Sequence, residues 1–149
     1  MDNTDERYMN EALKEAMQAA EEDEVPVGAV VVCKGRIVGK GHNMTERLND
    51  PTAHAEMIAI TAATEAVGGK YLNECTLYVT VEPCPMCAWA ILNARIPKVY
   101  FGAYDTVYGS LGTAMDLRDY MKSKTDVVGG ILEEECSQLL KDYFKEIRK

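Results

Sequence analysis

Two short stretches of this chain carry residue types that could bind a metal ion beside a general base. His54 and Glu56 are separated by one alanine, and Cys84 and Cys87 follow Pro83 further along the chain with Cys-x-x-Cys spacing. A hydrolytic zinc site uses three protein ligands and keeps the fourth tetrahedral position for water. One imidazole and two thiolates are a donor set that suits zinc. The pattern therefore predicts a catalytic zinc centre with His54, Cys84 and Cys87 as ligands.

Only one local structure lets His54 and Glu56 serve the same ion. Residues two apart do not share a face of a regular helix, so both must lie in a first helical turn, with the metal beyond the helix tip. The sequence Asp-Pro-Thr at residues 50–52 is a helix start signal and permits this arrangement. A helix from about Ala88 would place both sulfurs near its positive end, which helps to keep them ionised.

The cysteine pair has two simpler interpretations, a redox centre and half of a structural zinc site. A structural site needs two further ligands, and the remaining candidates form no second paired motif: Cys33, His42, Cys75 and Cys136. A thioredoxin-like centre leaves the upstream His-x-Glu unexplained. The simpler interpretation of Glu56 is a solvated helix acid, which fits poorly beside a ligand histidine. A catalytic zinc is favoured over these alternatives.

Length and composition indicate a single globular domain over residues 1–149. The chain is 47% hydrophobic and 27% charged, which is typical of globular proteins. No apolar run reaches membrane-spanning length. The N-terminus is acidic and lacks the pattern of a secretory signal. We therefore expect a cytoplasmic protein whose five cysteines are thiols or thiolates rather than a disulfide framework.

The net charge of −8 is concentrated near the N-terminus. Residues 1–24 hold nine acids and two bases, a charge of −7, and residues 25–149 hold fifteen acids and fourteen bases, a charge of −1. A strongly acidic total argues against a nucleic-acid partner, but most of the chain is nearly neutral. Charge therefore neither supports nor excludes RNA binding.

Hydrophobic periodicity predicts strands that alternate with helices. Such alternation indicates an α/β layered sheet with at least some parallel pairing. Both candidate metal-binding stretches come after a strand or at a helix start, where these folds place ligands. The expected helices cover residues 4–22, 50–67, 88–95 and 132–147, the expected strands 25–33, 36–40, 77–81, 98–102 and 126–128, and a surface loop 104–113.

The His-x-Glu and Pro-Cys-x-x-Cys motifs together match the pattern of zinc-dependent nucleobase deaminases, and the chain resembles the cytidine deaminase superfamily. Within it, the chain is most similar to the bacterial tRNA adenosine deaminases that convert the wobble adenosine to inosine. The likeness extends over most of the chain, through residues 24–30, 50–56, 77–84, 101–103 and 129–136.

The resemblance implies a three-layer α/β/α fold with a five-stranded mixed sheet, one Zn²⁺ per chain and a homodimer with active sites near the interface. It implies the tRNA anticodon arm as partner, with Asn43 bonded to the base and Val27 and Ala53 lining its pocket. Without the resemblance, Asn43 reads as a turn residue and the other two as core. In the implied mechanism zinc lowers the pKa of water and Glu56 takes a proton from it. Glu56 then acts as general base and acid, protonating first the ring nitrogen and then the departing ammonia.

Three features depart from the tRNA-enzyme pattern. Trp89 replaces a small residue, and either fills the core or reshapes the pocket or dimer contact. The loop 105–110 lacks a lysine, and residues 118–125 are short and lack an Asn-His pair. A deaminase of free bases or nucleosides (guanine, cytosine or a modified purine) is therefore the alternative enzyme. A zinc-containing binding module without catalysis is a third possibility, against which the intact Glu56 argues.

Overall fold

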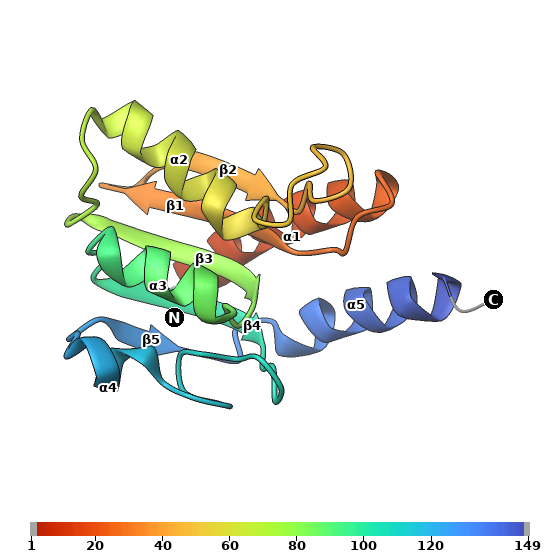
Figure 1. The fold of residues 1–149 in the computed structure, drawn as a ribbon. Helices are drawn as coiled ribbons and strands as arrows, with labels where there is room; N and C mark the ends of the chain where they lie inside the picture. Colours follow the sequence, from red (N-terminus) through yellow and green to blue (C-terminus); the bar gives the residue numbers. More distant parts are fainter. Residues whose placement is uncertain (1–2, 148–149) are drawn as a thin grey trace.

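The computed structural model describes residues 3–147, which form a five-stranded mixed sheet between layers of helices (Figure 1). The strand order is β2-β1-β3-β4-β5. β1 pairs antiparallel with both β2 and β3, whereas β3 pairs parallel with β4, and β4 with β5. The predicted mixed sheet is confirmed. Its strands are β1 Gly28–Cys33, β2 Arg36–His42, β3 Cys75–Val81, β4 Lys98–Ala103 and β5 Asp126–Val128.

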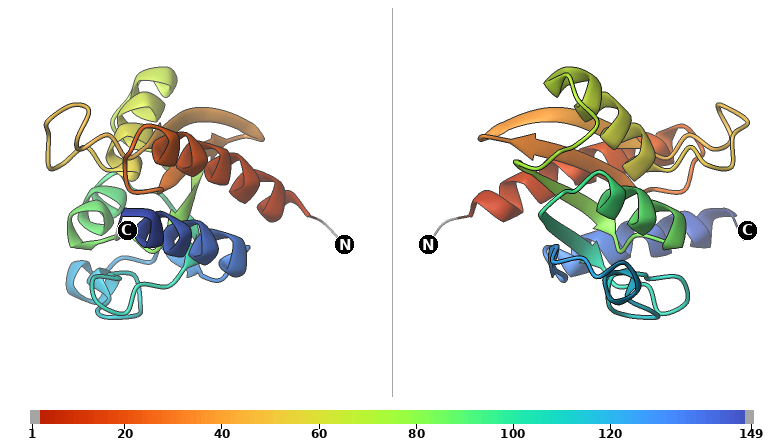
Figure 2. Two further views of the ribbon diagram at one scale, coloured as in Figure 1. Left: turned by 90° about the vertical axis from the view of Figure 1, so that its right-hand side faces the viewer. Right: turned by 60° about the vertical axis from the view of Figure 1, so that its left-hand side comes forward.

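The helices cover both faces of the sheet. Figures 1 and 2 show α1 and α5 together on one face, and α2 and α3 on the other. The short α4 packs beside α3. The fold is therefore the three-layer α/β/α arrangement expected from the sequence. The helices are α1 Thr4–Glu21, α2 Ala55–Val67, α3 Pro85–Asn93, α4 Leu117–Met121 and α5 Glu133–Ile147.

The central strand β1 is apolar throughout because helices cover both of its faces. In β1, Val30 belongs to the core under α1 and α5, whereas Ala29 and Val31 belong to the core under α2 and α3. All three side chains have no exposed surface. Alternate residues of one strand thus anchor opposite helix layers.

Two glycines of β2 let α2 lie directly against the sheet. A Cβ atom at Gly39 would lie 2.4 Å from the backbone oxygen of Ala59, and one at Gly41 would lie 2.4 Å from that of Ala55. The helix turns its buried alanines toward them. Because no side chain separates strand and helix here, β2 fixes the position of the N-terminus of α2.

Two helix starts differ from the sequence prediction. α2 begins at Ala55 rather than Asp50, because the Asp50 carboxylate accepts hydrogen bonds from the backbone N–H (2.8 Å) and hydroxyl (2.7 Å) of Thr52, and closes a turn instead of capping a helix. α3 begins at Pro85 rather than at about Ala88, because proline is favourable as the first residue of a helix. Within residues 3–147, none of the helices combines the length and apolar character that crossing a membrane requires.

Candidate metal centre and active-site cavity

The residues of the two sequence motifs meet where two helices begin at the same edge of the sheet. His54 is the N-cap residue of α2, and Cys84 is the N-cap residue of α3. Both have extended backbone conformations, so their side chains leave the helix end rather than a helix face. Glu56 and Cys87 lie in the first turns of their helices. Glu56 thus lies in the first turn, as the sequence required, whereas His54 directly precedes that turn as its N-cap residue.

Three potential ligand atoms lie close together. The Nδ1 atom of His54 is 3.6 Å from the Sγ atom of Cys84 and 3.5 Å from the Sγ atom of Cys87. All three ligand atoms lie within 4.8 Å of one another, and no other His, Cys, Asp or Glu group in residues 3–147 is so arranged. One ion could therefore contact all three atoms without a change in the backbone.

The electrostatics of this group favour a negative sulfur. The Cys87 thiol donates to Cys84 and, together with the contact to His54, lowers the pKa of Cys84 to about 4. The hydrogen bond to Cys84 in turn raises the pKa of His54. The pKa of Cys87 is raised, because this thiol donates to Cys84 and is buried. Two helix N-termini add favourable potential at the same place.

Glu56 is a buried carboxyl group next to these ligand atoms. Its side chain is 4% exposed. Burial, opposed by its own backbone N–H and assisted by the negative charge of Cys84, raises the pKa of Glu56 to about 7. A carboxyl group that titrates near neutrality can both accept and donate a proton there.

His54, Cys84 and Glu56 line a cavity of about 310 Å³. The volume is at the lower end of the range of small-molecule sites. Segments far apart in the sequence form its walls, from the α1–β1 connection to α5. Its apolar lining residues are Val25, Val27, Val81, Leu140 and Phe144, and its other lining residues are Asn43, Glu82, Asp105 and Tyr108.

The three residues assigned to the base pocket occupy different places. Asn43 and Val27 line the cavity. The Asn43 side-chain oxygen accepts the N–H of Ala55 at 3.1 Å, which orients the amide and leaves its nitrogen as the side chain's donor. Ala53 is buried but is not a lining residue, and its backbone oxygen accepts the N–H of Met44 at 2.9 Å.

Sequence reasoning found the chemical groups but missed most of the walls. The loop after β4 contributes Asp105 and Tyr108, although residues 104–113 read as a surface loop. The C-terminal helix contributes Leu140 and Phe144. The sequence predicted this helix, but nothing local in it showed which part of the molecule the helix covers.

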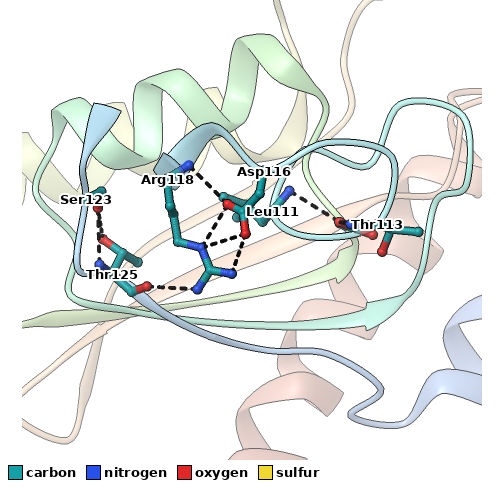
Figure 3. A network of polar contacts seen from close by, with 7 residues as sticks. Leu111, Thr113, Asp116, Arg118, Ser123 and Thr125 are labelled. Carbon is teal, nitrogen blue, oxygen red and sulfur yellow. Dashed lines mark hydrogen bonds and ion pairs between the residues drawn. The ribbon is translucent and has the colours of Figure 1, made fainter. Parts of the chain in front are cut away.

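The segments that depart from the tRNA-enzyme pattern have defined structures. The Trp89 side chain is 47% exposed on α3 and does not line the cavity, so it is not core filling. Residues 118–125 form α4 and a turn. Arg118 there binds the Asp116 carboxylate at 2.9 and 2.7 Å and donates to the backbone oxygen of Thr125 at 3.1 Å (Figure 3). This network orders the short connection into β5.

Comparison with known proteins places these features in context. The family model described as the cytidine and deoxycytidylate deaminase zinc-binding region matches residues 2–103. The chain is similar to the tRNA-specific adenosine deaminase of Bacillus subtilis (strain 168), with 48% identity over 147 residues, covering 97% of this chain and 91% of that protein.

Solved structures agree with this similarity. A structure from work on A-to-I editing by tRNA:A34 deaminases at the wobble position superposes with a TM-score of 0.82 and 43% identity, covering 90% of this chain and 99% of that one. The guanine deaminase of Bacillus subtilis superposes with a TM-score of 0.66 and 36% identity, covering 81% of this chain and 76% of that one.

Proposed function

Since this chain belongs to the cytidine and deoxycytidylate deaminase family, we propose that it is the deaminase that converts the wobble adenosine of tRNA to inosine. The reaction replaces the amino group of the base with oxygen from water and releases ammonia. The observation that carries the proposal is the cavity in which the buried Glu56 faces the His54 and Cys84 ligand atoms. Similarity to named tRNA adenosine deaminases over nearly the whole chain supports the substrate.

We propose that His54, Cys84 and Cys87 hold one Zn²⁺ per chain. The donor set fits the ion because two sulfurs and one imidazole nitrogen lie within 4.8 Å of one another, and one of the sulfurs has a strongly lowered pKa. When bound, zinc supplies a Lewis acid that lowers the pKa of water toward neutrality. Three protein ligands would leave the fourth position of a tetrahedral zinc ion for water, and two of these residues, His54 and Cys84, line the cavity.

Glu56 is the residue that moves the proton. Its carboxylate accepts a proton from the attacking water and delivers it to the ring nitrogen next to the amino-bearing carbon. It then accepts the second proton, from the hydroxyl group now attached to that carbon, and gives it to the departing amino group, which leaves as ammonia. Burial keeps bulk water away from the carboxyl group and raises its pKa, so that the protonated form is available to donate.

Two cavity residues would recognise the base. The Asn43 amide nitrogen can donate to a base acceptor because Ala55 holds the other end of the side chain. Val27 would contact the ring face. Ala53 would act indirectly, by fixing the turn before His54 through its bond to Met44.

The remaining expectations extend the proposal to the whole molecule. The partner is the tRNA anticodon arm, and the location is the cytoplasm, where reduced thiols match the free cysteines. Residues 1–149 act as one deaminase domain, as the continuous sheet supports. The chain forms a homodimer, which the exposed indole of Trp89 supports.

Deamination of a free base is the second candidate, because the chain is 36% identical to a guanine deaminase of known structure. Ammonia release separates the two candidates. Zinc-loaded protein is given an anticodon stem-loop with adenosine at position 34, and in parallel guanine, cytosine and free nucleosides. We expect ammonia from the stem-loop alone. Release from guanine with none from RNA would replace the proposal with the second candidate.

A further inference from the structure

A second buried carboxylate lies in the cavity wall and has no part in the proton transfers assigned to Glu56. Glu82 directly follows β3, lines the cavity and is 3% exposed. Its Oε1 atom accepts the N–H of Asp105 at 3.2 Å, and its Oε2 atom accepts those of Leu111 at 3.3 Å and Thr113 at 3.1 Å. No lysine or arginine within residues 3–147 forms an ion pair with it.

A buried charge is costly unless hydrogen bonds replace its hydration. Here the replacement comes from three backbone N–H groups of one loop, residues 105–113. Bonds of this kind to an ionised acceptor are roughly twice as strong as neutral ones. The loop therefore closes around the Glu82 carboxylate, and the carboxylate depends on the loop for its solvation.

The loop sequence is adapted to this closure. A Cβ atom at Gly109 would lie 2.5 Å from the Oε1 atom of Glu82 and 2.3 Å from the backbone oxygen of Asp105, so only glycine fits. The neighbouring Ser110 N–H donates to the backbone oxygen of Pro83 at 2.9 Å. The loop is thus attached to the segment that leads directly to Cys84. Figure 3 shows the end of the same loop, where Leu111 lies beside Asp116 and Thr113 lies further from the Asp116–Arg118 pair.

The Glu82 contacts extend to the residues that face the substrate space. Asp105, whose N–H binds Glu82, uses its own side-chain Oδ1 atom to accept the N–H groups of Val107 at 2.9 Å and Tyr108 at 3.0 Å. Asp105 and Tyr108 both line the cavity. A chain of hydrogen bonds therefore runs from Glu82 to the outer wall of the cavity.

We propose that Glu82 is a positioning residue, which fixes the loop 105–113 as a wall of the cavity and thereby sets how tightly the base is held. The inference rests on the proposed deaminase function and adds a residue to it. The side-chain hydrogen bonds of Glu82 within residues 3–147 go to the loop and not to His54, Glu56, Cys84 or Cys87, so we expect its effect on substrate binding. The other conceivable role of Glu82 is to support the metal ligands through Pro83. In that role, replacement of Glu82 would lower the zinc content, whereas our proposal predicts no change in zinc content.

Glu82→Gln is the sharpest test because it keeps the shape and removes one acceptor oxygen. Glutamine can accept at one position only, so at least one loop N–H then faces an amide NH₂ group. We expect NMR-detected exchange of the Asp105, Leu111 or Thr113 amides to quicken roughly tenfold or more. Zinc content should stay at one per chain. KM should rise roughly tenfold while kcat stays within about twofold of wild type. The reason is that loss of a contact from the cavity wall weakens the binding of the substrate and of the transition state equally.

Glu24→Gln is the matched control. Glu24 is also a buried carboxylate, 1% exposed, and its side chain accepts the N–H groups of Glu46 at 3.0 Å and Arg47 at 2.7 Å in a different loop. This variant should quicken exchange at residues 46 and 47 and leave residues 105–113 unchanged. A general loss of stability would instead affect both loops in both variants.

Unchanged exchange in residues 105–113 of Glu82→Gln would overturn the proposal, as would parallel loss of zinc and kcat. The exchange measurement needs no substrate, so it remains decisive if wild-type protein proves inactive on RNA. Inactivity of the wild type on RNA would rule out the proposed substrate, and KM would then be compared for whichever free base the wild type deaminates.

Discussion

At the scale of single residues, the assigned ligands divide into two kinds. His54 and Cys84 are N-cap residues with extended backbone angles, whereas Cys87 lies inside α3 and is fully buried. The cap positions let an imidazole and a thiolate project past the helix ends toward one point. The helix N-termini stabilise negative charge at that point by about 0.3–1 kcal/mol each. The ligand types follow from zinc chemistry, and their positions follow from the two helix starts.

The first prediction concerns the metal. Cys84→Ala removes the sulfur with the lowered pKa and leaves only two ligand atoms, so zinc content after dialysis should fall from about one per chain to near zero. Cys33→Ala is the control. Cys33 is a free cysteine at the last residue of β1, whereas the cavity lies near the first residue of that strand, so this change should leave the zinc content unchanged. Elemental analysis measures both. Full zinc occupancy in Cys84→Ala would refute the ligand assignment.

At the scale of elements, the close packing of α2 against β2 positions His54 and Glu56 at the start of that helix. A Cβ atom at Gly39 would overlap the backbone of α2, 2.4 Å from the Ala59 oxygen, whereas one at Gly69 would meet nothing within 4 Å. We therefore expect Gly39→Ala to lower the free energy of unfolding by about 1–3 kcal/mol. Gly69→Ala should stay within about 0.5 kcal/mol of wild type. Urea denaturation of both variants checks this, and equal stabilities would show that the helix has room to move.

The ion pair between Asp116 and Arg118, at the start of α4, should make the free energy of unfolding depend on pH in the acid range. The hydrogen bonds from Arg118 hold the pKa of Asp116 below its ordinary value. A lowered carboxyl pKa stabilises the fold above the unfolded-state value, about 4, and this contribution disappears as the pH falls through the folded-state value. Asp116→Asn keeps a capping side chain and removes the charge.

Wild type should therefore exceed Asp116→Asn in free energy of unfolding by about 0.5–1 kcal/mol at pH 7. The difference should shrink as the pH is lowered from about 4 toward 2. Denaturation at several pH values measures it. A difference that stays constant down to pH 2 would mean that the Asp116 charge contributes nothing.

The elements also show how far sequence reasoning reaches. The alternation of strands and helices predicted a layered α/β sheet with some parallel pairing, and the family resemblance predicted its five strands and its two helix layers. Metal chemistry placed His54 and Glu56 at one helix start. The start of α2 was wrong because the side chain of Asp50 can close a turn as well as cap a helix. The five-residue α4 is too short for a periodic signal. The walls from Leu140 and Phe144 were missed because their contacts join distant segments.

At the scale of the whole molecule, the proposed homodimer is testable through Trp89. An indole that keeps 47% of its surface exposed on α3 would gain by burial of that surface in an interface. Sedimentation of wild type should give about twice the chain mass of 16.5 kDa, and Trp89→Lys should weaken association at least tenfold. A wild type that sediments as a monomer at micromolar concentration would contradict the dimer.

The distribution of charge is compatible with an RNA substrate. Most of the net charge of −8 belongs to residues 1–24, and α1 lies on the opposite face of the sheet from α2 and α3 (Figure 2). The acids of α1 are therefore separated from the helices that carry the assigned metal ligands, whereas Glu22, Asp23 and Glu24 directly precede Val25 in the cavity wall. Repulsion of the phosphate backbone is therefore weaker over α2 and α3 than over α1 and this connection.

The most direct test is position-resolved inosine formation in an anticodon stem-loop. Zinc-loaded wild type and zinc-loaded Glu56→Gln are incubated with two stem-loops that differ only in adenosine or guanosine at position 34, and the digested nucleosides are analysed by mass spectrometry. We expect wild type to form one inosine and one ammonia from the adenosine stem-loop only. Glu56→Gln should keep its zinc and be at least roughly 10²-fold slower. Inosine formation by Glu56→Gln at the wild-type rate, or none by wild type, would contradict the proposed function.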